Sequence, residues 1–361
     1  MRVLEKSLII NPGSTSTKIA IFNGSIEEWA ETLNHSRNEI DEFNKIIDQL
    51  NWREKLILDA IEEAGYQLED FDFFVARGGL LDPIPGGTYL VGEEIVEDLK
   101  AGKNGEHASN LAAIIAYNFA DEIKAEAFIV DPVAVDEFKP VARLSGLPEL
   151  PRKCQSHALN LKAVGRKVAA ELGKNFNEIN QIGVHLGGGI SIAALEYGKI
   201  IDVNNANQGG PYSPERVGTL PALDLVNYIF ENQPNKSEFK KKLVGKGGLT
   251  AYLGTADGRE IEDRISSGDQ KAKLVYDGMA YQIAKEVGAM AAVLKGEVNA
   301  IFLTGGLANS KYLTDAIEEM ISYLAPVFIY PGAEEMEHLA TGGLRVIRGE
   351  EEAKDYKSER L

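Results

Sequence analysis

The sequence contains an internal repeat, and this repeat restricts the possible folds more than any other feature. Residues 8–33 are typical of an apolar strand, a turn of small residues, a second apolar strand, a tight turn and a third strand. The same order returns in 182–203, and 174 residues separate Gly13 from Gly187 and also Gly24 from Gly198. We therefore expect two similar α/β domains, each of which opens with an antiparallel three-stranded meander.

The rest of the chain alternates between strands and helices. Apolar spacing predicts helices over 52–64, 107–123, 157–172 and 270–294, and buried strands near 71–79, 127–132, 299–304 and 326–332. No low-complexity linker interrupts this pattern. The charged tail, 350–361, is expected to be solvated.

Composition excludes several classes of function. Lys and Arg number 38 against 55 Asp and Glu, a net charge of −17, which argues against general binding to nucleic acid or anionic membranes. No apolar stretch approaches the roughly 20 residues of a membrane span. The single Cys154 excludes an intramolecular disulfide and a zinc site built from cysteines. The N-terminus does not resemble a signal peptide, and we expect a cytoplasmic protein.

The first turn of the repeat, "NPGSTSTK", contains four consecutive hydroxyl side chains, Ser14 to Thr17, followed by Lys18. It is not a Walker A motif, because that motif has a second Gly before its Lys and a helix afterwards. Backbone N–H groups, hydroxyls and an ammonium can nevertheless hold a phosphate. The alternative is a solvated turn rich in Ser and Thr.

Two further glycine motifs favour a nucleotide. "HLGGGIS", 185–191, occupies the equivalent turn of the second copy, and its third glycine exceeds what a tight hairpin requires. "FLTGGLANS", 302–310, places Gly305 and Gly306 between a strand and a helix, where a ring or phosphate can approach the backbone. A double glycine at such a turn is by itself a weak signal.

Several charged side chains stand at the ends of buried strands or in loops. Arg77 ends an apolar strand beside glycines, and Arg216 lies in the loop "GGPYSPERVG", positions typical of a clamp for an anionic ligand. Asp131 also ends a buried strand, where it could instead cap a turn. His157 could equally be a satisfied histidine on an inward helix face, and His107, which opens a helix, is ambiguous in the same way.

These motifs, in this order, resemble the acetate and butyrate kinase (acetokinase) family, which forms acyl phosphates. "RGGLLDPIPGGTY", "GEHASN", "VDPVAVDEF" and "PGAEEMEHLATGG" are similar to its butyrate and branched-chain fatty acid kinase branch. Gly188 stands where acetate kinases usually carry Asn. The resemblance implies the duplicated ribonuclease-H-like fold of acetate and sugar kinases, heat-shock cognate proteins and actin, with ATP in an interdomain cleft. It places the first domain at 1–152 and 340–361 and the second at 153–339.

The resemblance also implies roles for individual residues. Those implied for nucleotide binding are Asn11, Ser14, Ser16, Lys18, His185, Gly187, Gly189, Gly305, Gly306 and Asn309. Those implied for catalysis are Arg77, Asp131, His157 and Arg216. Asp131 and Glu335 match the residues linked to Mg²⁺, although the adjacent Glu334 leaves the register open by one position.

The reaction so implied is the reversible phosphorylation of a short-chain fatty acid, butyrate or isobutyrate, by ATP with Mg²⁺. A carboxylic acid is already ionised at neutral pH and needs no general base. The pair of arginines therefore fits a carboxylate as phosphoryl acceptor better than it fits a sugar hydroxyl. The alternatives are an acetate or propionate kinase, and an actin-like or chaperone-like ATPase of the same fold. The expected partners are the fatty acid, its acyl phosphate and further copies of the chain in a dimer or larger homo-oligomer.

Overall fold

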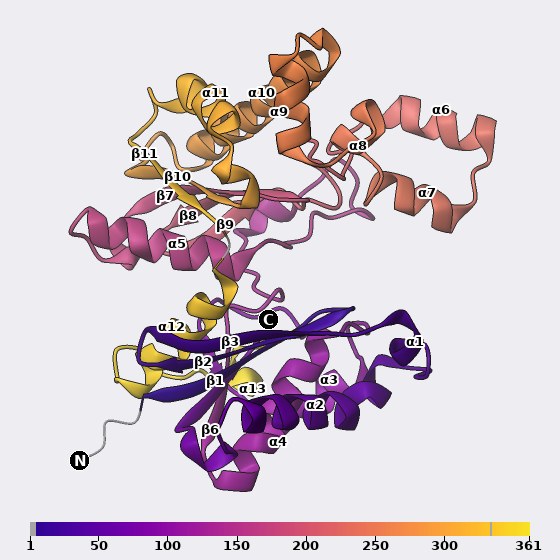
Figure 1. Cartoon of the computed structure of the whole chain (residues 1–361). Helices are drawn as coiled ribbons and strands as arrows, with labels where there is room; N and C mark the ends of the chain where they lie inside the picture. The colour runs from indigo at the N-terminus through magenta and orange to yellow at the C-terminus, as the bar shows by residue number, and fades with distance from the viewer. Residues whose placement is uncertain (1–4, 333) are drawn as a thin grey trace. The chain divides into compact units, whose positions relative to one another are not determined.

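The computed structural model describes residues 5–332 and 334–361, which form two compact units (Figure 1). The first unit contains the residues up to Asp136 together with Glu334–Leu361, so the C-terminal segment returns to the first half of the chain. The second unit runs from Glu137 to Gly332. The division inferred from the family resemblance, 1–152 with 340–361 and 153–339, stays a prediction about the folding domains.

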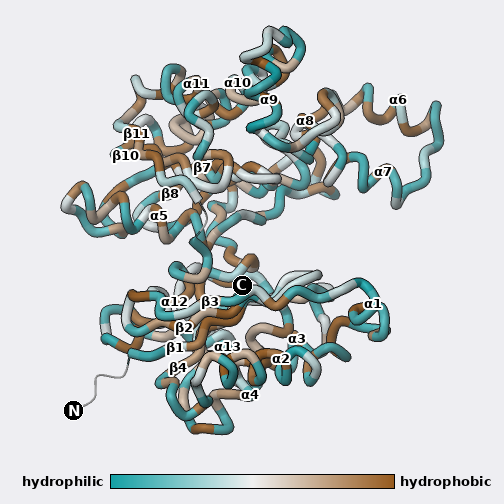
Figure 2. Tube along the Cα trace, in the orientation of Figure 1, coloured by the Kyte–Doolittle hydropathy of each residue, from teal (hydrophilic) through white to brown (hydrophobic). Residues whose placement is uncertain are grey.

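The first unit is built on a six-stranded mixed sheet. Its order is β3-β2-β1-β4-β6-β5; β1, β4 and β6 are parallel, and the β1–β2, β2–β3 and β5–β6 pairs are antiparallel. The strands are β1 (Lys6–Pro12), β2 (Ser16–Asn23), β3 (Ile26–Asn34), β4 (Phe73–Ala76), β5 (Thr88–Leu90) and β6 (Glu126–Val130). The hydrophobic stretches of the tube in Figure 2 include the central strands, which are buried.

Helices cover both faces of this sheet. Side chains of α2 (Leu50–Glu63), α3 (Glu93–Ala101) and α4 (Ser109–Ile123) form one core with Leu8, Ile10 and Phe74. On the other side α12 (Glu335–Ile347), yellow in Figure 1, packs on β1, β4 and β6. A Cβ on Gly342 would lie 2.5 Å from Val130, so glycine is what allows α12 to approach the sheet. This close packing fixes where α12 begins.

The second unit has a five-stranded sheet of order β11-β10-β7-β8-β9. Here β7, β10 and β11 are parallel, while β8 is antiparallel to both β7 and β9. The strands are β7 (Asn180–Leu186), β8 (Ile190–Glu196), β9 (Lys199–Val203), β10 (Ala300–Gly305) and β11 (Val327–Pro331).

Seven longer helices of the described residues belong to the second unit: α5 (Ala158–Glu171), α6 (Ala222–Asn232), α7 (Lys236–Leu243), α8 (Gly248–Leu253), α9 (Gly258–Ser266), α10 (Gln270–Val293) and α11 (Lys311–Ile321). Helix α5 contacts β7 and β10, and α8 to α11 share a core with the opposite face of the sheet. Helices α6 and α7 contain no buried residue and extend from the rest of this unit in Figure 1.

The structure confirms the duplication and corrects its register. Strand β7 lies 174 residues after β1 at both ends. The first turn, however, places four residues (13–16) between the paired Pro12 and Thr17, whereas the second places three (187–189) between its paired ends. Beyond this turn the equivalent positions are therefore 173 residues apart. Gly24 is the first residue of its two-residue hairpin turn and Gly198 is the second, so the constant offset between glycines does not follow structural equivalence.

The expectation of a solvated tail is only partly correct: most of its residues are exposed, but the segment is attached to the first unit. The backbone N–H of Lys354 donates to Thr88 O (2.8 Å), and that of Leu90 donates to Lys354 O (3.2 Å), which adds the tail to the edge of β5. Tyr356, at the start of the short α13 (Tyr356–Glu359), is buried and donates its hydroxyl to Asp98 (2.8 Å). One aromatic ring among eleven mostly polar residues thus anchors the segment. Within 5–332 and 334–361 no helix has the length and apolar character needed to cross a membrane.

Candidate active site

In the first unit, four of the predicted site residues form one cluster. Glu335 is the first residue of α12, Arg77 directly follows β4, and Asn11 lies in β1. Arg77 NH1 is 2.5 Å from Glu335 Oε1, and Asn11 Nδ2 donates to Glu335 Oε2 (2.9 Å). Lys18 is opposite Asn11 across the β1–β2 pair. Two strand residues and the residue after a third strand therefore converge on one carboxylate at a helix start, and Asn11 and Glu335 lie 324 residues apart in sequence.

The charge of Glu335 follows from this cluster. Burial favours its neutral form, but the charge and hydrogen bond of Arg77, the hydrogen bond of Asn11 and the charge of Lys18 outweigh burial and lower its pKa below the ordinary value. Glu335 is therefore ionised at neutral pH and holds Arg77 in place. Its contacts support Glu335, rather than Glu334, as the functional residue of the pair.

His107 lies close enough to this cluster to be influenced by it. Burial lowers its pKa, and the charge of Arg77 lowers it further. Its Nδ1 is 2.8 Å from Ser109 Oγ and accepts from Ser109 N (3.1 Å), at the first residue of α4. The structure thus gives His107 a role in forming the start of this helix.

Asp131 follows β6, the strand next to β4, and is 2% exposed. Its Oδ1 accepts from Gly87 N (2.8 Å), and its backbone adopts a positive φ of 37°, which is strained for a residue other than glycine. Gly78 packs against Pro132, because a Cβ on Gly78 would lie 2.3 Å from the Pro132 Cβ. Arg77 and Asp131 therefore follow two parallel strands whose ends are held together.

The first loop, residues 11–18, is partly exposed on its outer side and is supported by a buried residue on its inner side. Ser14 and Lys18 are exposed, Ser16 is half-buried, and Gly13 N donates to Ser16 O (2.7 Å) across the turn. Arg53, a buried residue of α2, lies beneath the turn, and no functional role was predicted for it. The sequence of α2 is that of an ordinary amphipathic helix, and nothing in its local pattern indicates that the Arg53 side chain points inward.

In the second unit, two predicted histidines stack on each other. The rings of His157 and His185 lie 3.9 Å apart at an angle of 14°. His157 Nδ1 is 3.0 Å from Ser191 Oγ, and His185 Nδ1 is 2.7 Å from Asn160 Oδ1. His157 precedes α5 rather than lying on its inward face, and β7 and β8 carry its partners. This geometry fixes both rings beside the second loop, residues 187–189.

Arg216 packs against the same loop. A Cβ on Gly189 would lie 2.1 Å from Arg216 NH1, so only glycine accommodates the guanidinium here. Ser213 Oγ donates to Gly188 O (2.6 Å) and accepts from Arg216 N (3.2 Å), which connects the two loops. Burial lowers the pKa of Arg216, and the neighbouring Glu215 opposes that effect. The structure therefore places Gly189, Arg216 and the histidine pair around one turn.

The third glycine motif is adjacent. Gly305 has a φ of 89°, and a Cβ on it would lie 2.3 Å from Leu186 O, so it packs against the end of β7. Gly306 and Asn309 are exposed in a 3₁₀ turn, Gly306–Asn309, and a Cβ on Gly306 would meet nothing within 4 Å. Gly305 is thus required for packing, whereas the surface at Gly306 is open to a ligand.

Comparisons with known proteins address the identity of the chain. The sequence profile of the acetokinase family matches residues 149–338. A probable butyrate kinase of Caldanaerobacter subterraneus subsp. tengcongensis is 50% identical over 97% of this chain and 99% of its own length. The chain belongs to the acetokinase family. A butyrate kinase of Clostridium acetobutylicum is also 50% identical, over 98% of this chain and 99% of its own.

The fold of an acetokinase is supported independently. The crystal structure of Porphyromonas gingivalis acetate kinase matches with a TM-score of 0.74 over 95% of this chain and 100% of that chain, at 18% sequence identity. The expected duplicated two-domain α/β fold is therefore confirmed.

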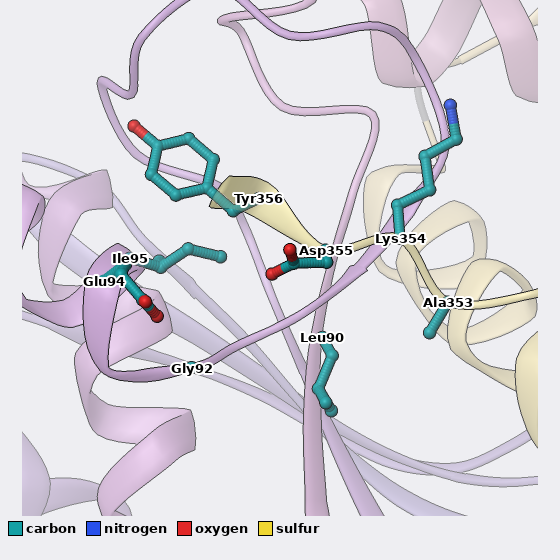
Figure 3. A pocket seen from close by; sticks show the side chains of 8 residues that line it. All are labelled: Leu90, Gly92, Glu94, Ile95, Ala353, Lys354, Asp355 and Tyr356. Carbon is teal, nitrogen blue, oxygen red and sulfur yellow. The ribbon is translucent and has the colours of Figure 1, made fainter. Parts of the chain in front are cut away.

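A pocket of about 150 Å³ lies elsewhere in the first unit of this acetokinase (Figure 3), between residues 90–95 and the tail segment 353–356. Its polar side chains are engaged: Lys354 Nζ donates to Gly86 O (2.7 Å), Tyr356 bonds Asp98, and Asp355 caps α13. It contains none of the predicted site residues, and we assign it no role in the reaction.

Proposed function

We propose that this chain is a butyrate kinase, which reversibly transfers a phosphoryl group from ATP to the carboxylate of butyrate. The observation that carries the proposal is the 50% identity, over nearly the full length, to butyrate kinases. The Arg77–Glu335 cluster and the loop around Arg216 provide the charges that this chemistry requires.

Charge neutralisation is the main requirement of the reaction. A short-chain fatty acid has a pKa near that of Glu, ~4.3, so it reaches the site as a carboxylate and needs no base. It must approach a negatively charged γ-phosphate, and this repulsion grows as water is excluded. We propose that Arg77 and Arg216 neutralise the transferred group and the substrate carboxylate. Glu335 holds Arg77 through NH1, and no other acceptor among the described residues engages the guanidinium, which leaves donors for the anion.

Each unit contains residues that we propose to contact the nucleotide. Asn11, Ser14, Ser16 and Lys18 hold phosphates from the first unit, and the exposure of Ser14 and Lys18 supports this. In the second unit the proposed phosphate contacts are His185, Gly187 and Gly189, and the proposed adenosine contacts are Gly305, Gly306 and Asn309. His157 donates to the equatorial oxygens of the phosphoryl group, and its ring is oriented by Ser191 and His185.

Magnesium would be held through Asp131 and Glu335. Among the described residues no group of three or more His, Cys, Asp or Glu side chains could hold a metal. Mg²⁺ commonly keeps several waters and binds through one or two carboxylates together with substrate phosphates. Both Glu335 oxygens already accept hydrogen bonds, so we expect this residue to contact Mg²⁺ through water. When bound, the ion neutralises charge on the phosphates.

Two further expectations belong to this proposal. We place the enzyme in the cytoplasm and expect a dimer or larger homo-oligomer. The apolar side chains of α6 support self-association, since Leu223 is 81% and Phe230 77% exposed in a helix without any buried residue.

Trapping the product with hydroxylamine tests the proposal. The chain is incubated with ATP, Mg²⁺ and hydroxylamine in three parallel reactions, one each with butyrate, isobutyrate and acetate. We expect butyryl hydroxamate to form and ADP release to depend on the added acid. ADP release that is independent of any acid would instead indicate an ATPase and would overturn the proposal.

A further inference from the structure

Arg53 is a buried arginine beneath the first loop. It lies in α2 and is 1% exposed. Its Nε and NH2 donate to Gln49 Oε1 (3.0 and 2.9 Å), one helical turn earlier, and its NH1 donates to Thr17 Oγ1 (2.9 Å). The guanidinium is therefore fixed on one side by its own helix and on the other by the end of the loop.

The remaining hydrogen bonds of Arg53 go to backbone carbonyls of the loop, and its guanidinium also lies over the Trp52 ring, 5.8 Å from the ring centroid. NH1 donates to Gly13 O (3.0 Å) and Ser16 O (3.3 Å), and NH2 donates to Ser14 O (3.4 Å). In a trans peptide the C=O and N–H groups point in opposite directions. Because the carbonyls of Gly13 and Ser14 face Arg53, the N–H groups of Ser14 and Thr15 face away from it. Within the part of the chain that the structure describes, neither N–H donates to a protein acceptor.

The charge of Arg53 has no counter-charge among the described residues. All of its acceptors are neutral: carbonyl oxygens, one hydroxyl and one amide. Burying an unpaired charge is unfavourable, and burial lowers the pKa of Arg53 to about 10. An anion on the outer side of the loop would compensate this charge.

The nearby titratable groups do not provide that compensation. His35 Nε2 is 2.9 Å from Thr17 Oγ1, and burial, followed by the charge of Arg53, lowers its pKa to about 4, with Glu39 opposing the shift. His35 is thus neutral from pH 6 upward. Glu39 is exposed and is engaged with Ser36 at the start of a short helix.

We propose that Arg53 is a positioning residue for the nucleotide phosphates. It holds the loop carbonyls inward, presents the N–H groups of Ser14 and Thr15 outward, and supplies positive charge from behind the loop. Turns with outward N–H groups bind anions, and a buried cation behind them strengthens that binding. The inference rests on the proposed function, because it requires the first loop to face phosphate.

Variants of Arg53 separate this role from simple structural support. Arg53→Met removes the charge and the donors, and we expect ADP affinity to fall about tenfold, the effect of one unit charge roughly 12 Å from a phosphate at an effective dielectric constant of ~20. The KM for butyrate should stay within about twofold. Ile57→Ala is the matched control: it creates a cavity one turn later on the same helix, at a residue of the hydrophobic core with 0% exposure.

Arg53→Lys supplies a readout that structural support alone would not change. A buried ammonium loses its proton at lower pH than a guanidinium. Calorimetric titration with ADP should therefore give nearly wild-type affinity at pH 6.5 and progressively weaker binding toward pH 9.0. Wild-type affinity should change little over this range. If Arg53→Met is too unstable to purify, this pH profile decides the question.

Two results would overturn the inference. If Arg53→Met keeps ADP affinity within twofold while its melting temperature falls as much as that of Ile57→Ala, Arg53 supports only the fold. If the ADP affinity of Arg53→Lys does not depend on pH more than that of the wild type, its charge is irrelevant to the nucleotide. Lys18→Met separates failure of the Arg53 inference from failure of the proposed function. If Lys18→Met also binds ADP normally, the assignment of the first loop to phosphate binding is wrong as well.

Discussion

Replacing Arg77 by Ala should abolish most activity while leaving the fold intact. The Arg77 guanidinium lies 2.5 Å from Glu335. Arg77 directly follows a buried strand, at a position where packing of the sheet does not require its side chain. Removing one preorganised charge donor lowers kcat by ~10²–10³. The two side chains are 29% and 33% exposed, so solvent screening limits the stability of their ion pair to about 1 kcal/mol. The melting temperature should therefore fall by only about 2–4 °C.

The assay is the initial rate of hydroxamate formation with butyrate, combined with thermal unfolding followed by circular dichroism. Arg348→Ala is the matched control, since it breaks the Arg348–Glu5 ion pair (2.8 Å) of the same unit away from the cluster. We expect that variant to keep wild-type kcat. Activity of Arg77→Ala within about threefold of wild type, or a loss equal to that in Arg348→Ala, would refute the assignment of Arg77.

Four further outcomes follow from the site. Gly189→Ala should displace the guanidinium of Arg216, because the new Cβ would lie 2.1 Å from NH1, and should lower kcat nearly as much as Arg216→Ala; steady-state kinetics of both variants checks this. Excess chelator should abolish turnover, and Asp131→Asn or Glu335→Gln should raise the Mg²⁺ concentration for half-maximal rate; an unchanged Mg²⁺ dependence would exclude both carboxylates. The lowered pKa of Glu335 means that its ionised form stabilises the fold above the ordinary value of 4.5 and that this contribution disappears as pH falls through the folded-state pKa. Melting temperatures of Glu335→Gln should therefore depend less on pH in the acid range than those of the wild type. Phe230→Glu, on the exposed face of α6, should shift the oligomer toward smaller species in light scattering without lowering the melting temperature, and an unchanged mass would exclude α6 as the contact.

Most of the strand framework could be predicted from the sequence, because it depends on local periodicity. The apolar runs and the glycines near positions 13 and 187 identified both meanders, and the strand ends at Arg77 and Asp131 followed from the same reasoning. The single residue of difference between the two turns could not be seen, since two hairpin glycines occupy different positions yet keep the same spacing.

Contacts between distant segments were the part that the sequence could not predict. Nothing in the sequence distinguishes Arg53 from the other charged residues of its helix, and its burial depends on a loop 40 residues earlier. Tyr356 lies in a charged tail, yet it joins the core of the first unit, and its hydroxyl accepts from Asp82 N and donates to Asp98. The convergence of Asn11, Arg77 and Glu335 likewise requires α12 to pack closely on the first sheet. In each case tertiary packing overrides what the local pattern indicates.

The ratio of kcat/KM for butyrate to kcat/KM for acetate tests the central claim most directly. Butyrate carries two more methylene groups, and burying each contributes ~0.8 kcal/mol, which together correspond to a preference of about 15-fold. A butyrate kinase should therefore favour butyrate by about this factor or more in the hydroxamate assay, with Mg²⁺ and ATP held constant. An equal or higher kcat/KM for acetate would contradict the assignment and would make the chain an acetate kinase.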